Sequence, residues 1–146
     1  MALGLRLEGS ASRVYCVVGD GEMDEGQIWE AAMAGAAYGA DNLVAIVDRN
    51  RVQATDITEK VMPEGNVSGK WAAFGWNVIE IDGHDFDQIL GALDAARSCK
   101  GKPTAIIVKS VKGKGVSFME DQASWHGAAP NDEQYAIAVA DIKATM

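Results

Sequence analysis

The chain has 146 residues, of which 48% are hydrophobic, so it is long and apolar enough to form one domain with a buried core. Its formal net charge is -8, which argues against nucleic acid and anionic membranes as partners, because both require clustered lysines and arginines. The sequence contains no apolar run of about 18 residues, the length that spans a membrane.

The first residues and the two cysteines give only general information. Residues 1–10 lack the basic-then-apolar layout of a signal peptide, and their leucines fit a helix or a strand equally well. Cys16 and Cys99 show no CxxC or metal-binding spacing, which favours reduced thiols and a cytoplasmic protein. Because the chain starts inside an apolar pattern, we expect that an earlier part of the domain is missing.

Two apolar strands with a helix between them are predicted near the start of the chain. Residues 13–19 form a nearly unbroken apolar run, which is typical of a strand covered on both faces. Asp24 is the expected N-cap of a helix that runs to Tyr38, and residues 43–48 form a second strand rich in β-branched side chains. This order predicts a βαβ unit with parallel strands and a right-handed crossover.

The rest of the chain continues this alternation after a long stretch without periodicity at 49–65. The predicted strands lie at 77–81 and 103–109, and a long loop follows at 110–130. A short helix is predicted at 67–74, with Trp71 and Phe74 facing inward, and a second helix is capped by Asp85, ends at Ser98 and buries Ile89, Leu90, Leu93 and Ala96. A last helix is capped by Asn131, and its packing face consists of Tyr135, Ala138, Val139 and Ile142. We therefore expect one α/β domain over residues 1–146, with a doubly wound, mainly parallel sheet of about four strands and helices on both faces.

Polar residues follow the first two predicted strands at the points where these strands end. Ligands of open parallel sheets bind beyond the carboxyl ends of the strands, and Asp20 and Asn50 both fall there. A carboxylate, an amide oxygen and a nearby backbone carbonyl form a set of hard oxygen ligands that suits Mg²⁺. The backbone N–H of Gly21, at a helix start, suits a phosphate. The simpler interpretation is that Asp20 only caps the following helix.

Three blocks of sequence, in this order, carry a resemblance to a known family. They are GDGEMDEGQIWEAAMAGAAYGADNLVAIVDRN, KWAAFGWNVIEIDGHDF and KGKGVSFMEDQASWHGAAPN. Together they resemble transketolase, in particular transketolases that are encoded as two separate subunits. The resemblance covers nearly the whole chain and implies the diphosphate-binding domain of the thiamine diphosphate-binding fold.

The resemblance also implies which residues hold the cofactor. Asp20 and Asn50 would bind Mg²⁺ (or Ca²⁺) through side-chain oxygens, and Val52 would bind it through its backbone carbonyl. Gly19 and Gly21, on either side of Asp20, would contact the diphosphate of thiamine diphosphate.

Two further residues match family positions with catalytic roles. Glu25 matches a glutamate at the subunit interface near the cofactors, and His126 matches a histidine that reaches the diphosphate and the substrate side of the cofactor. Glu25 also has a simpler interpretation, as a solvated carboxylate in the first turn of a helix. Arg51 departs from the glycine that often follows the asparagine in the family, and its side chain has the bulk to narrow the pocket.

Other polar residues have simpler interpretations that stay open. His84 lies in a turn between a strand and a helix, where a structural or solvated role is the more common one. Lys109, Lys112 and Lys114 form either a solvated basic stretch or contacts to a phosphate. The four tryptophans are expected to pack in the core, although Trp29 also suits a dimer face.

The resemblance implies the cofactor-binding part of a transketolase, an enzyme that transfers two-carbon ketol units between sugar phosphates in the pentose phosphate pathway. The glutamate that activates the aminopyrimidine belongs to another domain of the family, which this sequence lacks, so we expect the chain to be inactive alone. The expected partners are a second copy, through the helix at 24–38, and a second chain with the pyrimidine-binding and C-terminal domains. The alternatives are a non-catalytic fragment that only self-associates, or a subunit of a deoxyxylulose-phosphate synthase or 2-oxoacid dehydrogenase type enzyme.

Overall fold

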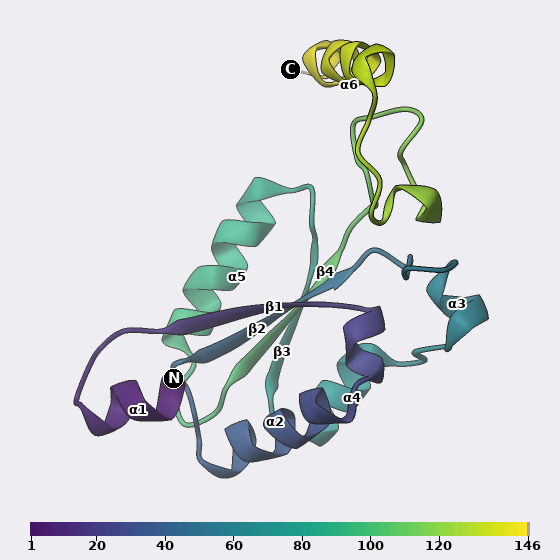
Figure 1. The fold of residues 1–146 in the computed structure, drawn as a ribbon. Coiled ribbons are helices and arrows are strands. Elements are labelled where there is room, and N and C mark those ends of the chain that lie inside the picture. Colours follow the sequence, from purple (N-terminus) through teal and green to yellow (C-terminus); the bar gives the residue numbers. More distant parts are fainter. Residues whose placement is uncertain (146) are drawn as a thin grey trace.

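The computed structural model describes residues 1–145 and contains a single four-stranded sheet (Figure 1). All neighbouring strands are parallel, and their order in the sheet is β1-β2-β4-β3. The strands are β1 (Val14–Gly19), β2 (Leu43–Arg49), β3 (Asn77–Asp82) and β4 (Thr104–Lys109). The parallel sheet confirms the expected fold class, and the predicted strand positions agree with these bounds to within one residue.

Helices lie on both faces of this sheet, and α2 and α4 share one face while α5 covers the other (Figure 1). The helical elements are α1 (Ala2–Leu7), the 3₁₀ turn η1 (Gly21–Asp24), α2 (Gly26–Ala37), α3 (Thr58–Val61), α4 (Val67–Ala73), α5 (Phe86–Ser98), the 3₁₀ turn η2 (Ala123–Trp125) and α6 (Asp132–Ala144). No helix within residues 1–145 is long and apolar enough to cross a membrane.

The core between the sheet and helices α2 and α4 is built around tryptophans. Trp71 and Trp76 are buried, and the centroids of their rings are 4.8 Å apart. Trp29 of α2 lies against Trp71 with a centroid distance of 5.5 Å. The indole N–H of Trp76 donates to the carbonyl oxygen of Ala32 at 2.8 Å, so this buried polar group is satisfied. These contacts confirm that these three tryptophans have a packing role.

The core on the other face is formed by α5 and the apolar side chains of β2, β3 and β4. Ala92 and Ala96 are buried there, and Ile89 and Leu93 pack against the same cluster. The prediction that Leu90 is buried is wrong, because this side chain is 60% exposed. The four inward residues follow the i, i+3, i+4, i+7 spacing of one helix face, and position 90 falls outside that stripe.

Strand β1 is covered only in part. Val18 is buried on the α2 side, but Cys16 on the same face is exposed, and Tyr15 and Val17 on the other face are 45% and 65% exposed. Val17 lies opposite Ile46 of β2, which packs against the cluster that α5 covers, but no residue of β1 belongs to that cluster. The prediction of a strand covered on both faces is therefore wrong for β1. An apolar run shows that a strand is suited to burial and does not show what covers it.

The predicted helix caps are confirmed at two positions and wrong at one. The side chain of Asp85 accepts hydrogen bonds from backbone N–H groups in the first turn of α5. Asn131 and Gln134 form a reciprocal capping box at the start of α6. Asp24 does not cap α2, because it ends η1 and the N-cap position of α2 is occupied by Glu25. Glu22 accepts a hydrogen bond from the amide of Gly19, which favours the tight turn before the helix.

Helix α6 stands apart from the sheet (Figure 1). Its side-chain bonds to the rest of the chain join Asp141 to Ser117 in the loop after β4. Of the predicted packing face, Ala138 is buried, but Tyr135 and Ile142 are 62% and 46% exposed. The predicted packing face is therefore confirmed for Ala138 and wrong for the two large side chains Tyr135 and Ile142.

Gly83 marks a close approach that we expect to be sensitive to substitution. A Cβ at Gly83 would lie 2.5 Å from Cγ1 of Val108 and 3.1 Å from the carbonyl oxygen of Lys109. Gly83→Ala should therefore lower the free energy of unfolding by about 1–3 kcal/mol, the usual cost of overpacking. Gly91 has no atom within 4 Å of its would-be Cβ, so Gly91→Ala in α5 should be neutral or slightly stabilising. Urea unfolding of both variants checks this contrast, and equal effects would contradict it.

Candidate cofactor and metal site

Most of the predicted site residues line one cavity at the carboxyl edge of β1 and β2. The cavity has a volume of about 330 Å³ and is lined by Gly19, Asp20, Gly21, Glu22, Asn50, Val52, Gln53, Ala54 and His126. All the residues that the sequence predicts for the metal and the diphosphate are in this set. Their proximity arises because β1 and β2 are adjacent and parallel, so that the residues that follow them emerge at the same edge.

Asp20 is a buried carboxylate held by two donors. It follows β1 directly, and only 2% of its surface is exposed. Its Oδ1 accepts from the backbone N–H of Gly21 at 2.8 Å, and its Oδ2 accepts from the hydroxyl of Thr58 at 3.1 Å. A carboxylate oxygen can accept more than one hydrogen bond or ligand, so both oxygens keep lone pairs for a cation. Sequence reasoning missed Thr58, whose contact joins segments 38 residues apart.

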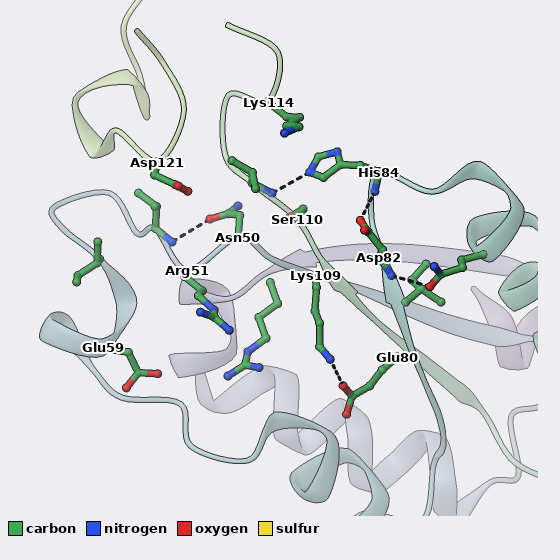
Figure 2. A pocket seen from close by; sticks show the side chains of 16 residues that line it. Asn50, Arg51, Glu59, Glu80, Asp82, His84, Lys109, Ser110, Lys114 and Asp121 are labelled. Atoms are coloured by element: carbon green, nitrogen blue, oxygen red, sulfur yellow. Dashed lines mark hydrogen bonds and ion pairs between the residues drawn. The ribbon is translucent and has the colours of Figure 1, made fainter. Parts of the chain in front are cut away.

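Asn50 and Val52 form a tight turn after β2. The amide nitrogen of Asn50 donates to Asp48 at 3.0 Å. Its Oδ1 accepts from the backbone N–H of Val52 at 3.0 Å (Figure 2). These two bonds fix the orientation of the Asn50 amide. Val52 is buried and pairs with Ile57 in an isolated antiparallel bridge, which joins the two sides of the short turn between them.

The chemistry of these donors fits a hard divalent cation. Asp20 supplies a carboxylate, and Asn50 and Val52 supply neutral carbonyl oxygens around the same cavity. Within residues 1–145, no group of three or more His, Cys, Asp or Glu side chains is placed to hold a metal without further ligands. A cation here would therefore depend on phosphate oxygens and water for its remaining ligands, which is the usual mode of Mg²⁺.

Gly21 allows close packing beside Asp20, whereas a Cβ at Gly19 would meet no atom within 4 Å. A Cβ at Gly21 would lie 2.9 Å from Cγ of Gln53, so a side chain here would press against the loop after β2. The amide of Gly19 donates to the carboxylate of Glu22 at 3.0 Å, and the amide of Gly21 donates to Asp20. Both amides thus have partners within the chain, and their contact with a diphosphate stays a prediction.

The two residues with predicted catalytic roles lie in different places. His126 lines the small cavity, beside Asp20 and Asn50, although it comes from the loop after η2. Glu25 does not line the cavity; it is exposed at the N-cap position of α2, and its side chain makes no capping hydrogen bond. The structure therefore brings His126 to the site and leaves Glu25 outside it, and both catalytic roles stay predictions.

A larger cavity of about 990 Å³ lies beside the first, on the side of β3 and β4 (Figure 2). Arg51 lines this larger cavity and not the small one. Its φ is +64°, a left-handed backbone conformation that glycine adopts at little cost and other residues adopt rarely. The Arg51 side chain therefore does not narrow the small cavity, contrary to the sequence-based expectation.

Lys109, Lys114 and His84, which line the larger cavity, form contacts within the chain. Lys109 pairs with Glu80 at 2.7 Å, and Lys114 lies 3.7 Å from Glu120. Nε2 of His84 accepts from the backbone N–H of Val111 at 2.9 Å, which ties the turn after β3 to the loop after β4 (Figure 2). The contact of His84 favours its structural interpretation, whereas Lys109 and Lys114 form ion pairs within the chain, which neither sequence-based interpretation described.

Glu64 is a buried carboxylate near the site that sequence reasoning missed. It is 4% exposed, and its Oε2 accepts from Nε of Arg49 at 3.2 Å. Burial raises the pKa of the Glu64 carboxyl, Arg49 lowers it, and the charges of Asp20 and Asp24 raise it further, so the net direction is upward. A single glutamate in a stretch without periodicity gives no signal of burial, because the burial depends on how the loop folds back.

The raised pKa of Glu64 predicts a pH dependence of stability with a definite sign. The folded chain holds the Glu64 proton more tightly than the unfolded chain does. The contribution of Glu64 to the free energy of unfolding should therefore fall as the pH rises from the ordinary glutamate pKa through the raised pKa. Chemical unfolding of the wild type and Glu64→Gln over this pH range measures the difference. A difference that grows in favour of the wild type with rising pH would contradict this prediction.

The parallel sheet and the oxygen-lined cavity at its carboxyl edge define a cofactor-binding α/β domain. A family profile described as "Transketolase, thiamine diphosphate binding domain" matches residues 7–143. The chain therefore belongs to the transketolase family of thiamine diphosphate-binding domains, which confirms the resemblance of the three sequence blocks.

Similar proteins include subunits of bacterial transketolases. The chain is 43% identical over 142 residues to one subunit of an apulose-4-phosphate transketolase from Phocaeicola vulgatus, covering 97% of this chain and 50% of that protein. It is 40% identical over 143 residues to the 6-deoxy-6-sulfo-D-fructose transketolase subunit SqwG from a Clostridium species, covering 98% of this chain and 52% of that protein. The chain thus spans about half the length of these curated relatives.

Solved transketolase structures have the same fold over most of this chain. A crystal structure of transketolase from Campylobacter jejuni matches with a TM-score of 0.86 and 30% identity, covering 92% of this chain and 21% of that one. A transketolase from Pichia stipitis in complex with sedoheptulose-7-phosphate matches with a TM-score of 0.85 and 26% identity, covering 92% of this chain and 20% of that one.

Proposed function

We propose that this chain is the thiamine diphosphate- and Mg²⁺-binding part of a transketolase that transfers two-carbon ketol units between sugar phosphates. The observation that carries the proposal is the convergence of Asp20, Asn50 and Val52 on one cavity, which they share with Gly19 and Gly21. Neither the cation nor the substrate follows from family membership alone. The cation in the proposal is supported by the hard oxygen donors around the cavity, and the reaction is supported by the similarity to transketolase subunits.

The residues of the chain would each have a separate task in this function. Asp20, Asn50 and Val52 would hold the cation, and the cation would hold the diphosphate against the turn at Gly19 and Gly21. When bound, thiamine diphosphate supplies the thiazolium carbon that carries the ketol group between donor and acceptor. His126, at the edge of the cavity, would provide a hydrogen-bonding group on the substrate side.

Activity would require further protein groups that residues 1–146 do not supply. The relatives in the transketolase family are named as subunits, which supports a second chain that carries the pyrimidine-binding and C-terminal domains. We propose in addition a homodimer through α2, as the sequence predicts, since Met33 and Tyr38 at this helix are 52% and 63% exposed and leave apolar surface for a protein contact. A cytoplasmic location would fit the free thiols of Cys16 and Cys99.

A ketol-transfer assay tests this function. The purified chain is mixed with a partner chain that carries the two other domains, and product formation from a ketose phosphate and an aldose phosphate is followed. Activity should require both chains, thiamine diphosphate and Mg²⁺, and each chain alone should be inactive. Consumption of pyruvate without ketol transfer would overturn the proposal in favour of a deoxyxylulose-phosphate synthase or 2-oxoacid dehydrogenase type reaction. The absence of both activities would favour a non-catalytic fragment.

A further inference from the structure

The loop that carries most of the metal donors is closed at its base by one ion pair. Arg49 is the last residue of β2, and Glu64 lies just before α4. Nε of Arg49 donates to Oε2 of Glu64 at 3.2 Å, and the two side chains are 20% and 3% exposed. The chain between them, residues 50–63, therefore forms a loop whose two ends are joined by a largely buried contact.

The interior of this loop is tied to Asp20. The hydroxyl of Thr58 donates to Asp20, and the backbone N–H of Thr58 donates to the carbonyl oxygen of Arg51 at 2.9 Å. Asn50 and Val52 lie in the same loop and line the cavity that Asp20 borders. A change in the position of the loop would therefore move two proposed cation ligands relative to the third.

The pair is poorly explained as a device for stability alone. Oε1 of Glu64 is buried without a hydrogen-bond partner among residues 1–145, and an unsatisfied buried acceptor costs free energy. Buried ion pairs often contribute less to stability than apolar residues of similar volume. A paired guanidinium and carboxylate do, however, fix a geometry that apolar contacts would leave looser. A geometric role accounts better for this pair.

We propose that the Arg49–Glu64 pair positions residues 50–63 over Asp20 and thereby sets the affinity of the cavity for a divalent cation with its diphosphate. Glu64 and Arg49 are positioning residues in this account, since neither lines the small cavity. The part of the proposal that concerns the cation rests on the proposed function. The part that concerns the loop is independent of any ligand.

The first test measures amide hydrogen exchange of the chain without ligand. Arg49→Gln removes the guanidinium that pairs with Glu64 and leaves the buried carboxylate without its charged partner. Exchange in residues 50–63 should be about tenfold faster in this variant, and exchange in the four strands should be unchanged, because only the loop opens locally. Arg49→Lys, which keeps the charge, should retain more of the loop protection than Arg49→Gln. Unchanged exchange in the loop, or equal acceleration in loop and strands, would overturn the proposal.

The second test measures the binding of Mg²⁺ with thiamine diphosphate by calorimetry, with the partner chain present. The dissociation constant should rise roughly tenfold in Arg49→Gln, although the loss of a positive charge by itself would favour a cation. Asp94→Asn is the matched control, because it removes one charge from an exposed ion pair with Arg97 on α5, and it should leave the constant within about twofold. An unchanged constant in Arg49→Gln would overturn the proposal even if its loop opens. If the wild type binds no cofactor, the proposed function fails, and the exchange test still decides the role of the pair in the loop.

Discussion

Replacing Asp20 with asparagine should abolish tight magnesium-dependent binding of thiamine diphosphate. Asp20 provides the only charged oxygen in the proposed donor set, and it is buried, where the attraction between a carboxylate and a divalent cation is weakly screened. Asparagine has nearly the same shape but replaces one oxygen by an NH₂ group, which cannot bind a cation. We expect the dissociation constant of the Mg²⁺–cofactor pair to rise roughly 100-fold or more.

The fold should survive this substitution, because the hydroxyl of Thr58 can rotate to accept a hydrogen bond from the new amide. Asp24→Asn is the matched control. Asp24 accepts from Gln53 near the mouth of the cavity at 3.2 Å but does not line the cavity. Asp24→Asn should change the dissociation constant of the Mg²⁺–cofactor pair by less than about threefold, because the charge of Asp24 is exposed to solvent. Equal losses in the two variants would mean that general negative charge, and not Asp20 itself, attracts the cation.

Trp71→Ala should cause the largest loss of stability in the chain. Trp71 is 2% exposed and lies between Trp29 and Trp76, so its removal leaves a large void at the centre of the core. Truncation of a buried tryptophan costs about 3–5 kcal/mol, and whole domains are stable by only about 5–15 kcal/mol. Guanidinium unfolding followed by circular dichroism measures the shift in the denaturation midpoint. The loss should leave the variant with little remaining free energy of unfolding at room temperature.

Two further tryptophan variants make this prediction specific. Trp71→Phe should keep most of the stability, because it preserves the ring and removes an indole N–H that is buried without a partner among residues 1–145. Trp125→Ala should cost much less than Trp71→Ala, since Trp125 is only half-buried in the loop after β4, where it packs on Phe118. A loss for Trp125→Ala as large as that for Trp71→Ala would contradict the assignment of the core.

The strands, and the proximity of the proposed metal donors, were predictable because local sequence determines them. Each strand is a short apolar run, and runs of this kind in alternation with helices lead to a parallel sheet. Asp20 and Asn50 directly follow two such runs, and adjacent parallel strands bring their ends together. The caps at Asp85 and Asn131 were predictable for a similar reason, since a cap depends on residues within one turn of the helix.

The features that were missed depend on contacts between distant parts of the chain. The exposure of Val17 depends on where α5 ends, and the burial of Glu64 depends on how a long loop folds onto β2. The role of Thr58 depends on its contact with Asp20 across 38 positions. Asp24 was misassigned because two short-range possibilities compete after Gly21, a 3₁₀ turn and a helix start, and the sequence pattern fits both.

Calorimetric titration of the chain with thiamine diphosphate tests the central claim most directly. The titration is carried out with Mg²⁺ and with a chelator in its place, both for the chain alone and with a partner chain that carries the pyrimidine-binding domain. Our account predicts saturable binding that requires Mg²⁺ and is lost in Asp20→Asn. Binding that is equal with and without the cation, or no binding even with the partner chain, would contradict it.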